Sequence, residues 1–464
     1  MFRGIISGLF VASALAAVSS NTVTRTLKDA PVESGLCDAT VDSYSGYFNV
    51  KSGVDKNYFY WFFESRSETQ STDPVIVWLT GGPGCSSQLA LLTENGPCTV
   101  SEDGQSTVNN PFSWNTNANI MWLDQPASVG FSYGAPIVDN DHNEAEVGED
   151  VYWFMQEFYK AHPEFRANDL YIFGESYGGH YAPSVASRIF EGNNNKDGEK
   201  INLAGVGVGN GLTDPVIQYQ YYPAMAMNNT YGIKTVSEEA YEKMVKHVPT
   251  CTKMGQMCQL NTTYCEAADE FCQMTETMPY YNTGLNPYDI RKPCGDSDLC
   301  YDFTNIETFL NLPSTMDALH VNTEKVKEWK SCNTVVNAGF TSDWMKNYQQ
   351  VLIPMLEADI DVLIYAGDVD FVCNWMGNKA WTMDLPWSGK NDFVSAEDIT
   401  WSYVESGDDV AGGLVRTADA AEGSGSLTFL QVYEAGHMVP MDKPQAALTM
   451  LNTFIQKKSF VDTK

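Results

Sequence analysis

Four apolar runs, each opening onto a loop that contains glycine, constrain the fold of this chain more than any other feature. They cover residues 73–80, 169–173, 361–365 and 427–433. Nearly continuous apolar runs of this length predict strands that are buried on both faces, as in a parallel sheet. A helical spacing of apolar residues lies between them, for example at 146–161. The alternation predicts an α/β protein whose mostly parallel sheet is covered by helices and binds ligands beyond the carboxyl ends of its strands.

The strand pattern fades between about residues 214 and 331. Four cysteines there recur every seven residues, a spacing unlike the closely paired cysteines of zinc sites: Cys251, Cys258, Cys265 and Cys272. We therefore expect disulfides and no metal, because bridges would stabilise a region with too little core of its own. The pattern favours one domain, residues 37–460, with a disulfide-rich helical cap inserted at about 214–331.

The first residues have the features of a secretory signal peptide. Arg3 precedes an apolar run at 5–18, and residues 14–16 read Ala-Leu-Ala, a small-x-small cleavage pattern. The run is shorter than the ~20 apolar residues that span a membrane. We therefore expect a signal peptide at 1–17 and no membrane anchor. Only a short segment, 18–36, precedes the predicted domain, so we expect no large propeptide.

The cysteines and two short motifs agree with a route through the secretory pathway. Eleven cysteines behind a signal peptide indicate a disulfide framework with at least one unpaired thiol. Asn228 and Asn261 begin Asn-x-Thr motifs, which predict N-glycosylation on surface loops. The expected destination is either secretion or a vacuole- or lysosome-like compartment.

The charge of the chain excludes one class of partner. With 59 acidic and 28 basic residues, the net charge is −31. Phosphate backbones and anionic lipid surfaces repel such a protein, so we expect no binding to nucleic acid. An acidic balance also suits a protein that works at low pH, where protonation removes part of the self-repulsion.

The segment 174–178 reads Gly-Glu-Ser-Tyr-Gly and directly follows the predicted strand at 169–173. A G-x-S-x-G between a strand and a helix is a nucleophile elbow, a turn sharp enough to expose the serine hydroxyl above the sheet. The N-terminus of the following helix favours negative charge at this point. This context indicates that Ser176 is a catalytic nucleophile.

A serine nucleophile needs an imidazole that takes its proton and returns it to the leaving group. His437 lies in a loop after the last predicted strand, which fits the chain order Ser, Asp or Glu, His that accompanies such an elbow. His180 is only four residues from Ser176, and a structural hydrogen bond suits it better. The orienting acid should follow the third predicted strand, where the pattern leaves Asp368 and Asp370 as alternatives.

Longer motifs carry a resemblance to a known family. The segments 81–87 (Gly-Gly-Pro-Gly-Cys-Ser-Ser) and 174–181 (Gly-Glu-Ser-Tyr-Gly-Gly-His-Tyr) resemble the signature pair of the serine carboxypeptidases, peptidase family S10. Further matches extend over most of the chain, at 123–126, 209–215, 365–374 and 436–440. The chain is most similar to the yeast vacuolar carboxypeptidase Y group at 289–292, 344–346 and 373–375.

The resemblance implies an α/β-hydrolase fold and the release of C-terminal residues from peptides and proteins without a metal or cofactor. It selects the second aspartate, Asp370, as the acid of a triad with Ser176 and His437. It also places the oxyanion hole at the backbone N–H groups of Gly82 and Tyr177. Donors of this kind stabilise the tetrahedral oxyanion.

Recognition of the free α-carboxylate of the substrate is implied at Thr80, Gly81, Glu94 and Glu175. Two acidic side chains can bind an acid if one is protonated, because close carboxyl groups raise each other's pKa. We therefore expect the highest activity at acidic pH. Thr80 departs from the family pattern, since many relatives carry Asn there. A carboxypeptidase-like acyltransferase or esterase with the same triad is the alternative.

The resemblance also implies roles for the sulfur-containing residues. Cys373 is the unpaired thiol that lines the substrate site, and Met438 lines the pocket of the leaving residue. The implied disulfides are Cys85–Cys332, Cys251–Cys272, Cys258–Cys265 and Cys294–Cys300. Cys37 and Cys98 are left over, and we expect them to bridge each other.

Overall fold

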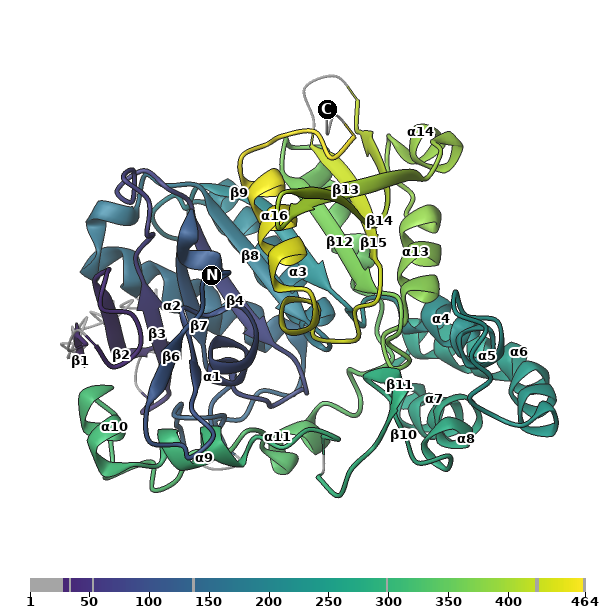
Figure 1. The fold of residues 1–464 in the computed structure, drawn as a ribbon, viewed down its shortest axis with the longest axis horizontal. Coiled ribbons are helices and arrows are strands. Elements are labelled where there is room, and N and C mark those ends of the chain that lie inside the picture. The colour runs from purple at the N-terminus through teal and green to yellow at the C-terminus, as the bar shows by residue number, and fades with distance from the viewer. Residues whose placement is uncertain are drawn as a thin grey trace, which may run out of the picture.

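A twisted sheet of eleven strands forms the centre of the molecule, in the order β1-β2-β3-β7-β4-β8-β9-β12-β15-β14-β13 (Figure 1). The computed structural model describes residues 28–461 except 33–34, 52–53, 136–137, 298 and 422–424. The predicted signal peptide lies outside these residues. The strands of this sheet are β1 (Lys28–Pro31), β2 (Ser43–Asn49), β3 (Asn57–Phe63), β4 (Val75–Thr80), β7 (Asn119–Leu123), β8 (Leu170–Glu175), β9 (Leu203–Gly209), β12 (Asp361–Gly367), β13 (Ile399–Glu405), β14 (Asp408–Asp419) and β15 (Ser426–Val432).

The six central strands, from β7 to β15, run parallel, and antiparallel strands complete both edges. The four runs predicted as strands are β4, β8, β12 and β15, so the prediction of a mostly parallel sheet is confirmed. At one edge, Ser406 and Gly407 join β13 to β14, and both have a left-handed φ, as a tight hairpin turn requires.

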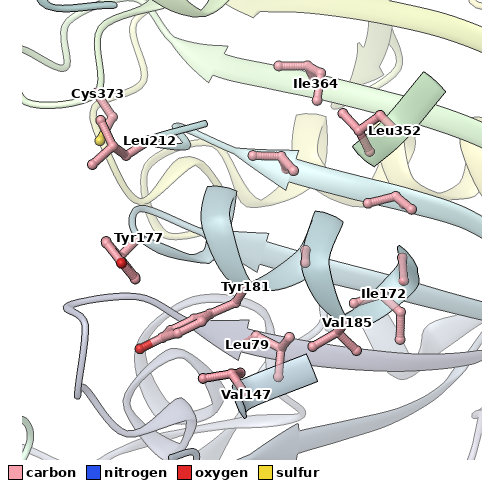
Figure 2. Close-up of a cluster of buried hydrophobic side chains, with 14 of the residues drawn as sticks. Leu79, Val147, Ile172, Tyr177, Tyr181, Val185, Leu212, Leu352, Ile364 and Cys373 are labelled. Atoms are coloured by element: carbon pink, nitrogen blue, oxygen red, sulfur yellow. The ribbon is translucent and has the colours of Figure 1, made fainter. Parts of the chain in front are cut away.

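Helices cover both faces of the sheet, so two hydrophobic cores form. On one face, Val147 of α2 (Glu144–Ala161) and Val185 of α3 (Gly178–Asn195) belong to the same buried cluster as Ile172 of β8 (Figure 2). On the other face, the long helix α16 (Pro444–Ile455) packs its apolar side against the sheet. The other α-helices of the described residues are α1 (Ser87–Ala90), α4 (Pro215–Gln218), α5 (Tyr222–Met227), α6 (Glu238–Leu260), α7 (Cys265–Cys272), α8 (Met278–Tyr281), α9 (Thr304–Leu310), α10 (Pro313–Ala318), α11 (Thr334–Gly339), α12 (Ile353–Leu356), α13 (Trp375–Asp384), α14 (Lys390–Ser395) and α15 (Val439–Asp442).

The long connection between β9 and β12 contributes no described strand to the central sheet. In Figure 1 its first part forms a helical lobe, α4 to α8, at the lower right, beside the carboxyl ends of the strands, and its last part, α9 to α11, runs along the lower left. A short hairpin, β10 (Leu285–Asn286) and β11 (Asp289–Pro293), lies between the two parts. The insertion predicted at about 214–331 therefore consists of two separate helical parts, and its boundaries stay a prediction.

The disulfides connect the same pairs that we expect from the sequence: Cys37–Cys98, Cys85–Cys332, Cys251–Cys272, Cys258–Cys265 and Cys294–Cys300. Two of them lie in the helical lobe, where α6 and α7 pack against each other through buried cysteines. Cys85–Cys332 ties the long insertion to the loop that follows β4. Of the described cysteines, Cys373 alone is unpaired, and it is buried.

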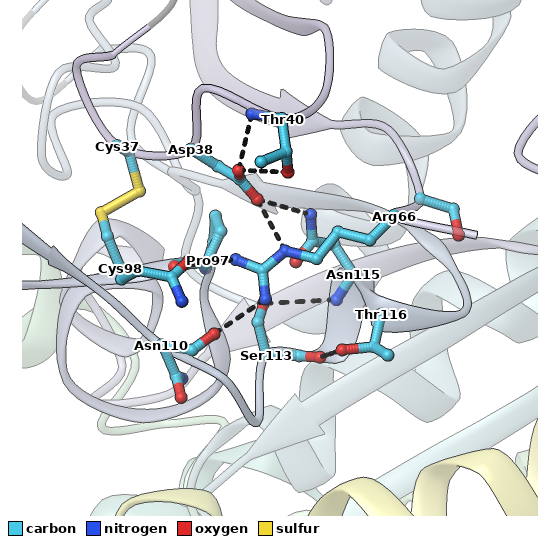
Figure 3. Close-up of polar contacts among 12 residues, drawn as sticks. Cys37, Asp38, Thr40, Arg66, Pro97, Cys98, Asn110, Ser113, Asn115 and Thr116 are labelled. Carbon is cyan, nitrogen blue, oxygen red and sulfur yellow. Dashed lines mark hydrogen bonds and ion pairs between the residues drawn. A yellow bond between two sulfur atoms is a disulfide. The ribbon is translucent and has the colours of Figure 1, made fainter. Parts of the chain in front are cut away.

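A half-buried arginine, Arg66, lies beside the Cys37–Cys98 disulfide (Figure 3). The Nε of Arg66 donates to Asp38 at 2.7 Å, and its other nitrogens donate to the backbone carbonyls of Asn110 and Pro97 at 2.8 and 3.1 Å. One guanidinium thus joins the N-terminal segment to the segment around Cys98. Within the described residues, no helix is long and apolar enough to cross a membrane, and no group of His, Cys, Asp and Glu is arranged to hold a metal ion.

Candidate active site

Ser176 lies in the turn between β8 and α3, with a left-handed φ of 62°. Non-glycine residues rarely adopt this conformation, so the surrounding structure must impose it. The glycines at both ends of the turn are needed for space. A Cβ on Gly174 would lie 2.3 Å from the Gly178 carbonyl oxygen, and one on Gly178 would lie 2.7 Å from the Leu79 carbonyl oxygen. The turn therefore has the geometry of a nucleophile elbow.

His437 and Asp370 are in direct contact at the carboxyl end of the sheet. The Nδ1 of His437 lies 2.8 Å from the Oδ2 of Asp370, which is fully buried. Asp370 also accepts hydrogen bonds from Asn210 Nδ2 at 2.8 Å and from the backbone N–H groups of Val372 and Cys373 at 3.1 and 3.2 Å. The carboxylate is thus held by four donors, and it orients the imidazole with its Nε2 free for other contacts.

Asp368, the other aspartate that the sequence pattern leaves open, has different partners. Its carboxylate accepts from the Tyr231 hydroxyl at 2.9 Å, from Gln431 Nε2 at 3.1 Å and from the backbone N–H of Glu434 at 2.8 Å. The geometry therefore favours Asp370 as the partner of the histidine.

Ser176 and His437 line the same cavity, which has a volume of about 320 Å³. The cavity is also lined by six further residues whose roles the resemblance implies: Thr80, Gly81, Gly82, Glu94, Glu175 and Met438. Cys373 adjoins the nucleophile. Burial and the charge of Asp370 raise the pKa of this thiol well above its ordinary value, and a hydrogen bond with the Ser176 side chain opposes the rise.

The loop after β4 approaches the elbow closely and brings Gly82 to the cavity. A Cβ on Gly81 would lie 2.4 Å from the Tyr177 backbone nitrogen, so only glycine fits there. Gly82 has a φ of 113°, which also favours glycine. Among the described residues, neither Gly82 nor Tyr177 donates its backbone N–H to another protein group. Two N–H groups beside the serine are thus available to a ligand oxygen.

Glu94 and Glu175 form a buried pair of carboxyl groups on the wall of the cavity. Burial raises the pKa of both groups, and the charge of Glu94 raises that of Glu175 further. One oxygen of each side chain, Oε2, has no hydrogen-bond partner among the described residues. Two neighbouring buried carboxylates repel each other, which favours a proton on the pair.

Thr80, at the end of β4, lines the same cavity. Its hydroxyl oxygen accepts a hydrogen bond from the indole N–H of Trp78 at 3.0 Å. An indole N–H can only donate, so the hydroxyl proton of Thr80 is left to donate elsewhere.

The family model of the serine carboxypeptidases matches residues 35–457. The chain belongs to the serine carboxypeptidase family. It is a hydrolase, a serine-type carboxypeptidase that acts on peptides or proteins.

Individual relatives agree with this family. Serine carboxypeptidase 3 of Hordeum vulgare is 42% identical over 429 residues, which cover 91% of this chain and 80% of that protein. Carboxypeptidase Y of Candida albicans is 42% identical over 434 residues, or 92% of this chain and 76% of that protein. The crystal structure of the prohormone-processing carboxypeptidase Kex1 of Saccharomyces cerevisiae resembles the fold with a TM-score of 0.78 at 25% identity, over 92% of this chain and 95% of that one. The predicted α/β-hydrolase fold is thereby confirmed.

The structure of this carboxypeptidase adds one residue that sequence reasoning did not single out. Asn210 donates to Asp370, and its Oδ1 accepts from the backbone N–H of Gly367 at 2.9 Å. It therefore joins the end of β9 to the aspartate. The sequence offered a signal, because Asn210 lies in one of the matched motifs directly after a glycine-rich strand.

The two predicted glycosylation sites of this carboxypeptidase lie on the surface of the helical lobe or beside it. Asn228 and Asn261 are both exposed, as are the threonines that complete their motifs, Thr230 and Thr263. Asn261 precedes a turn in which its Oδ1 accepts from the Thr263 backbone N–H at 3.1 Å. Both positions are thus open to modification, which stays a prediction.

Proposed function

We propose that this carboxypeptidase releases the C-terminal residue of a peptide through an acyl-enzyme on Ser176. His437 takes the serine proton as the hydroxyl attacks the last peptide carbonyl, and it then donates that proton to the leaving amine. Asp370 orients the imidazole, and water hydrolyses the ester. The observation that carries the proposal is that the elbow serine and the Asp370-bound histidine line one cavity with a buried pair of carboxyl groups.

The oxyanion of the tetrahedral intermediate would be held by the backbone N–H groups of Gly82 and Tyr177. The support is geometric, since Tyr177 follows the nucleophile and the Gly81 backbone packs against the elbow. Losing one such donor typically costs about 10²–10³ in kcat.

Exopeptidase specificity would come from Glu94 and Glu175, together with Thr80 and the backbone of Gly81. A protonated carboxyl group donates a hydrogen bond to the α-carboxylate of the substrate, and the Thr80 hydroxyl supplies a second donor. Raised pKa values keep the pair protonated at acidic pH, so carboxylate recognition is complete there and is lost as the pH rises through those values. We therefore propose that activity is highest at acidic pH.

The leaving residue would occupy the apolar part of the cavity. Its lining includes a group of apolar and aromatic side chains: Leu89, Tyr288, Leu299, Tyr301, Phe303 and Met438. Among the described residues that line this cavity, the ionisable side chains are the two glutamates, His437 and two tyrosines. We propose that the preferred substrates end in an apolar residue, because a charged side chain would be desolvated there without a partner.

The five disulfides support a site of action in an oxidising compartment of the secretory pathway. Secretion and a vacuole- or lysosome-like compartment both satisfy this condition. N-glycosylation at Asn228 and Asn261 belongs to the same proposal.

The deciding experiment follows digestion of an N-blocked peptide that ends in leucine, at about pH 5, by mass spectrometry. We expect stepwise loss of single C-terminal residues, no loss with Ser176→Ala, and slower loss when the peptide is C-terminally amidated. A peptide ending in aspartate tests the apolar pocket and should be cleaved more slowly. An intact peptide, despite labelling of Ser176 by a fluorophosphonate, would contradict peptide release and would favour the acyltransferase or esterase alternative.

A further inference from the structure

The hairpin β10–β11 lies between the two loops that carry Asp370 and His437. The acid loop, residues 368–373, and the base loop, residues 434–438, follow neighbouring parallel strands, β12 and β15. The hairpin donates from the Ile290 N–H to the Val369 carbonyl at 2.9 Å, and its Pro287 carbonyl accepts from the Phe371 N–H at 3.0 Å. One element of the insertion thus makes backbone hydrogen bonds to the acid loop on both sides of Asp370.

The same hairpin contacts the base loop. The backbone N–H of His437 donates to the Tyr288 carbonyl at 2.9 Å, and the two side-chain rings lie 5.0 Å apart. The space between the hairpin and this loop is filled, because a Cβ on Gly436 would lie 2.3 Å from the Tyr288 carbonyl oxygen. The position of the histidine backbone therefore depends on the position of the hairpin.

A cluster of four charged residues fastens the hairpin to the base loop. Asp289 is fully buried and accepts from Arg291 Nε and Nη2, both at 2.9 Å, while Lys292 Nζ lies 3.0 Å from its Oδ2. Although burial opposes ionisation, these bonds hold the pKa of Asp289 below its ordinary value. Lys292 also faces Asp442, at 3.8 Å.

The cluster contacts the base loop at two points. Arg291 Nη2 donates to the Glu434 carbonyl at 3.3 Å, and the Gly436 N–H donates to Asp442 Oδ2 at 2.7 Å. Glu434 has a left-handed φ of 57°, a conformation that a non-glycine residue holds only where its surroundings impose it. Arg291 is the one described side chain that joins Asp289, on the hairpin, to a carbonyl of this loop.

We propose that Arg291 is a positioning residue for His437, which it holds in place through the base loop without touching the substrate. The inference rests on the proposed function, in which His437 is the catalytic base. The forked guanidinium carries the role, because it bonds Asp289 and the Glu434 carbonyl together, and a lysine cannot make both contacts with the same geometry. A displacement of a catalytic group by about 1 Å can cost roughly 10² in rate.

The test compares Arg291→Met with a matched variant, Arg416→Met. Arg416 also belongs to a site where one aspartate, Asp398, binds an arginine and a lysine, and it also donates to a backbone carbonyl, that of Phe393 at 2.8 Å. In this second site Arg416 belongs to β14, which pairs with the edge strand β13, and the site lies away from the cavity. Both variants lose an arginine from the same kind of site, so both should lower the Tm.

Kinetics on the N-blocked leucine peptide at 25 °C then separate the two variants. We expect Arg291→Met to lower kcat about 10- to 100-fold with KM within about twofold, and to slow fluorophosphonate labelling of Ser176 in parallel. Arg416→Met should keep the kcat of the wild type, and Arg291→Lys should fall between Arg291→Met and the wild type. An unchanged kcat in Arg291→Met, or an equal loss in Arg416→Met, would overturn the inference.

Two controls keep the result interpretable. If Arg291→Met does not fold, Arg291→Lys carries the test, and a wild-type kcat in that variant would overturn the inference. His437→Ala tests the proposed function separately from the role of Arg291. An inactive His437→Ala beside a fully active Arg291→Met rejects the inference alone, whereas an active His437→Ala rejects the proposed function itself.

Discussion

The buried carboxyl groups on the two sides of Ser176 differ in their hydrogen-bond partners. On one side, Asp370 accepts four hydrogen bonds, from His437, Asn210 and two backbone N–H groups. On the other side, Glu94 and Glu175 face each other, and each has an oxygen without a partner among the described residues. Both sites are buried, so burial does not decide the charge. Hydrogen-bond donors around a carboxyl group favour its charged form, whereas a second carboxyl group beside it, as in the Glu94–Glu175 pair, favours the protonated form.

This difference matches the chemistry proposed for each side. A carboxylate is needed beside His437, because it must stabilise the imidazolium that forms during attack. A protonated acid is needed where the α-carboxylate of the substrate binds, because only a donor can hold an anion there.

The largest loss of activity is expected when the charge of Asp370 is removed while the shape of its side chain is kept. We expect Asp370→Asn to lower kcat by about 10⁴, since the amide would present an N–H to His437 and favour the wrong tautomer. Asp368→Asn is the control, because that aspartate does not contact His437 and its amide keeps an oxygen that can accept from the Glu434 N–H, so its loss of kcat should stay below about 100-fold. Single-turnover kinetics of both variants measure the effect. Equal losses in the two would contradict the assignment of Asp370.

The second prediction concerns Glu94→Gln, which replaces a protonated acid with an amide that donates at every pH. In the wild type, kcat/KM for a peptide with a free carboxylate should fall as the pH rises through the raised pKa values of the glutamate pair. Glu94→Gln keeps a donor at all pH values, so this alkaline decline should flatten. We expect the ratio of variant to wild type to rise about 10- to 100-fold between pH 5 and pH 9.

The amidated peptide is the control for this pH dependence, because it has no carboxylate to recognise. Its kcat/KM should not show the same alkaline decline in the wild type. A decline of equal size for the free and the amidated peptide would assign the titration to another group and would remove the glutamate pair from substrate recognition.

The third prediction concerns Thr80, whose hydroxyl is a neutral hydrogen-bond donor in the same cavity as the glutamate pair. Thr80→Val removes the hydroxyl, and we expect kcat/KM for the free-carboxylate peptide to fall about 10- to 100-fold, the loss expected for one hydrogen bond to a charged group. Thr80→Ser keeps the donor and should stay within about threefold of the wild type. An equal loss for the amidated peptide would show that Thr80 supports the fold through Trp78 instead.

Much of the scaffold could be predicted from the sequence, because the parallel strands are continuous apolar runs and the elbow is a short local motif. β9 could not be found in this way. It reads Leu-Ala-Gly-Val-Gly-Val-Gly, and its glycines are required because aromatic rings of neighbouring strands lie directly over them. A Cβ on Gly207 would lie 2.1 Å from the Phe173 ring. The constraint comes from tertiary packing, and the resulting alternation of glycine and valine is not the continuous apolar run by which the other parallel strands were predicted.

The site shows the same limit. Ser176 and His437 could be proposed from local context, but choosing between Asp368 and Asp370 needed the resemblance, since both follow the same strand. Asn210 and Arg291 belong to matched motifs, but the motifs assign neither residue a role. Their roles depend on contacts across the sequence, Asn210 with Asp370 and Arg291 with Glu434, which no local pattern encodes.

The last prediction tests the comparison through stability instead of rate. The pKa of Glu94 is raised in the folded state above its ordinary value of 4.5, because burial disfavours the charged form. Its contribution to stability is therefore fully present below pH 4.5 and is lost as the pH rises through the raised value. Glu94→Gln has no such charge to bury. Between pH 4.5 and pH 9 the Tm of the wild type should fall relative to that of the variant, by about 1–4 °C.

Asp398→Asn supplies the opposite sign in the same calorimetric series. Bonds from Lys379 and Arg416 outweigh burial and hold the pKa of Asp398 below its ordinary value of 3.8. Its contribution to stability is present above pH 3.8 and is lost as the pH falls, so Asp398→Asn should be less stable than the wild type at neutral pH and should approach it in acid. If both variants changed with pH in the same direction, the partners of each carboxyl group would not be what sets the direction of its pKa shift.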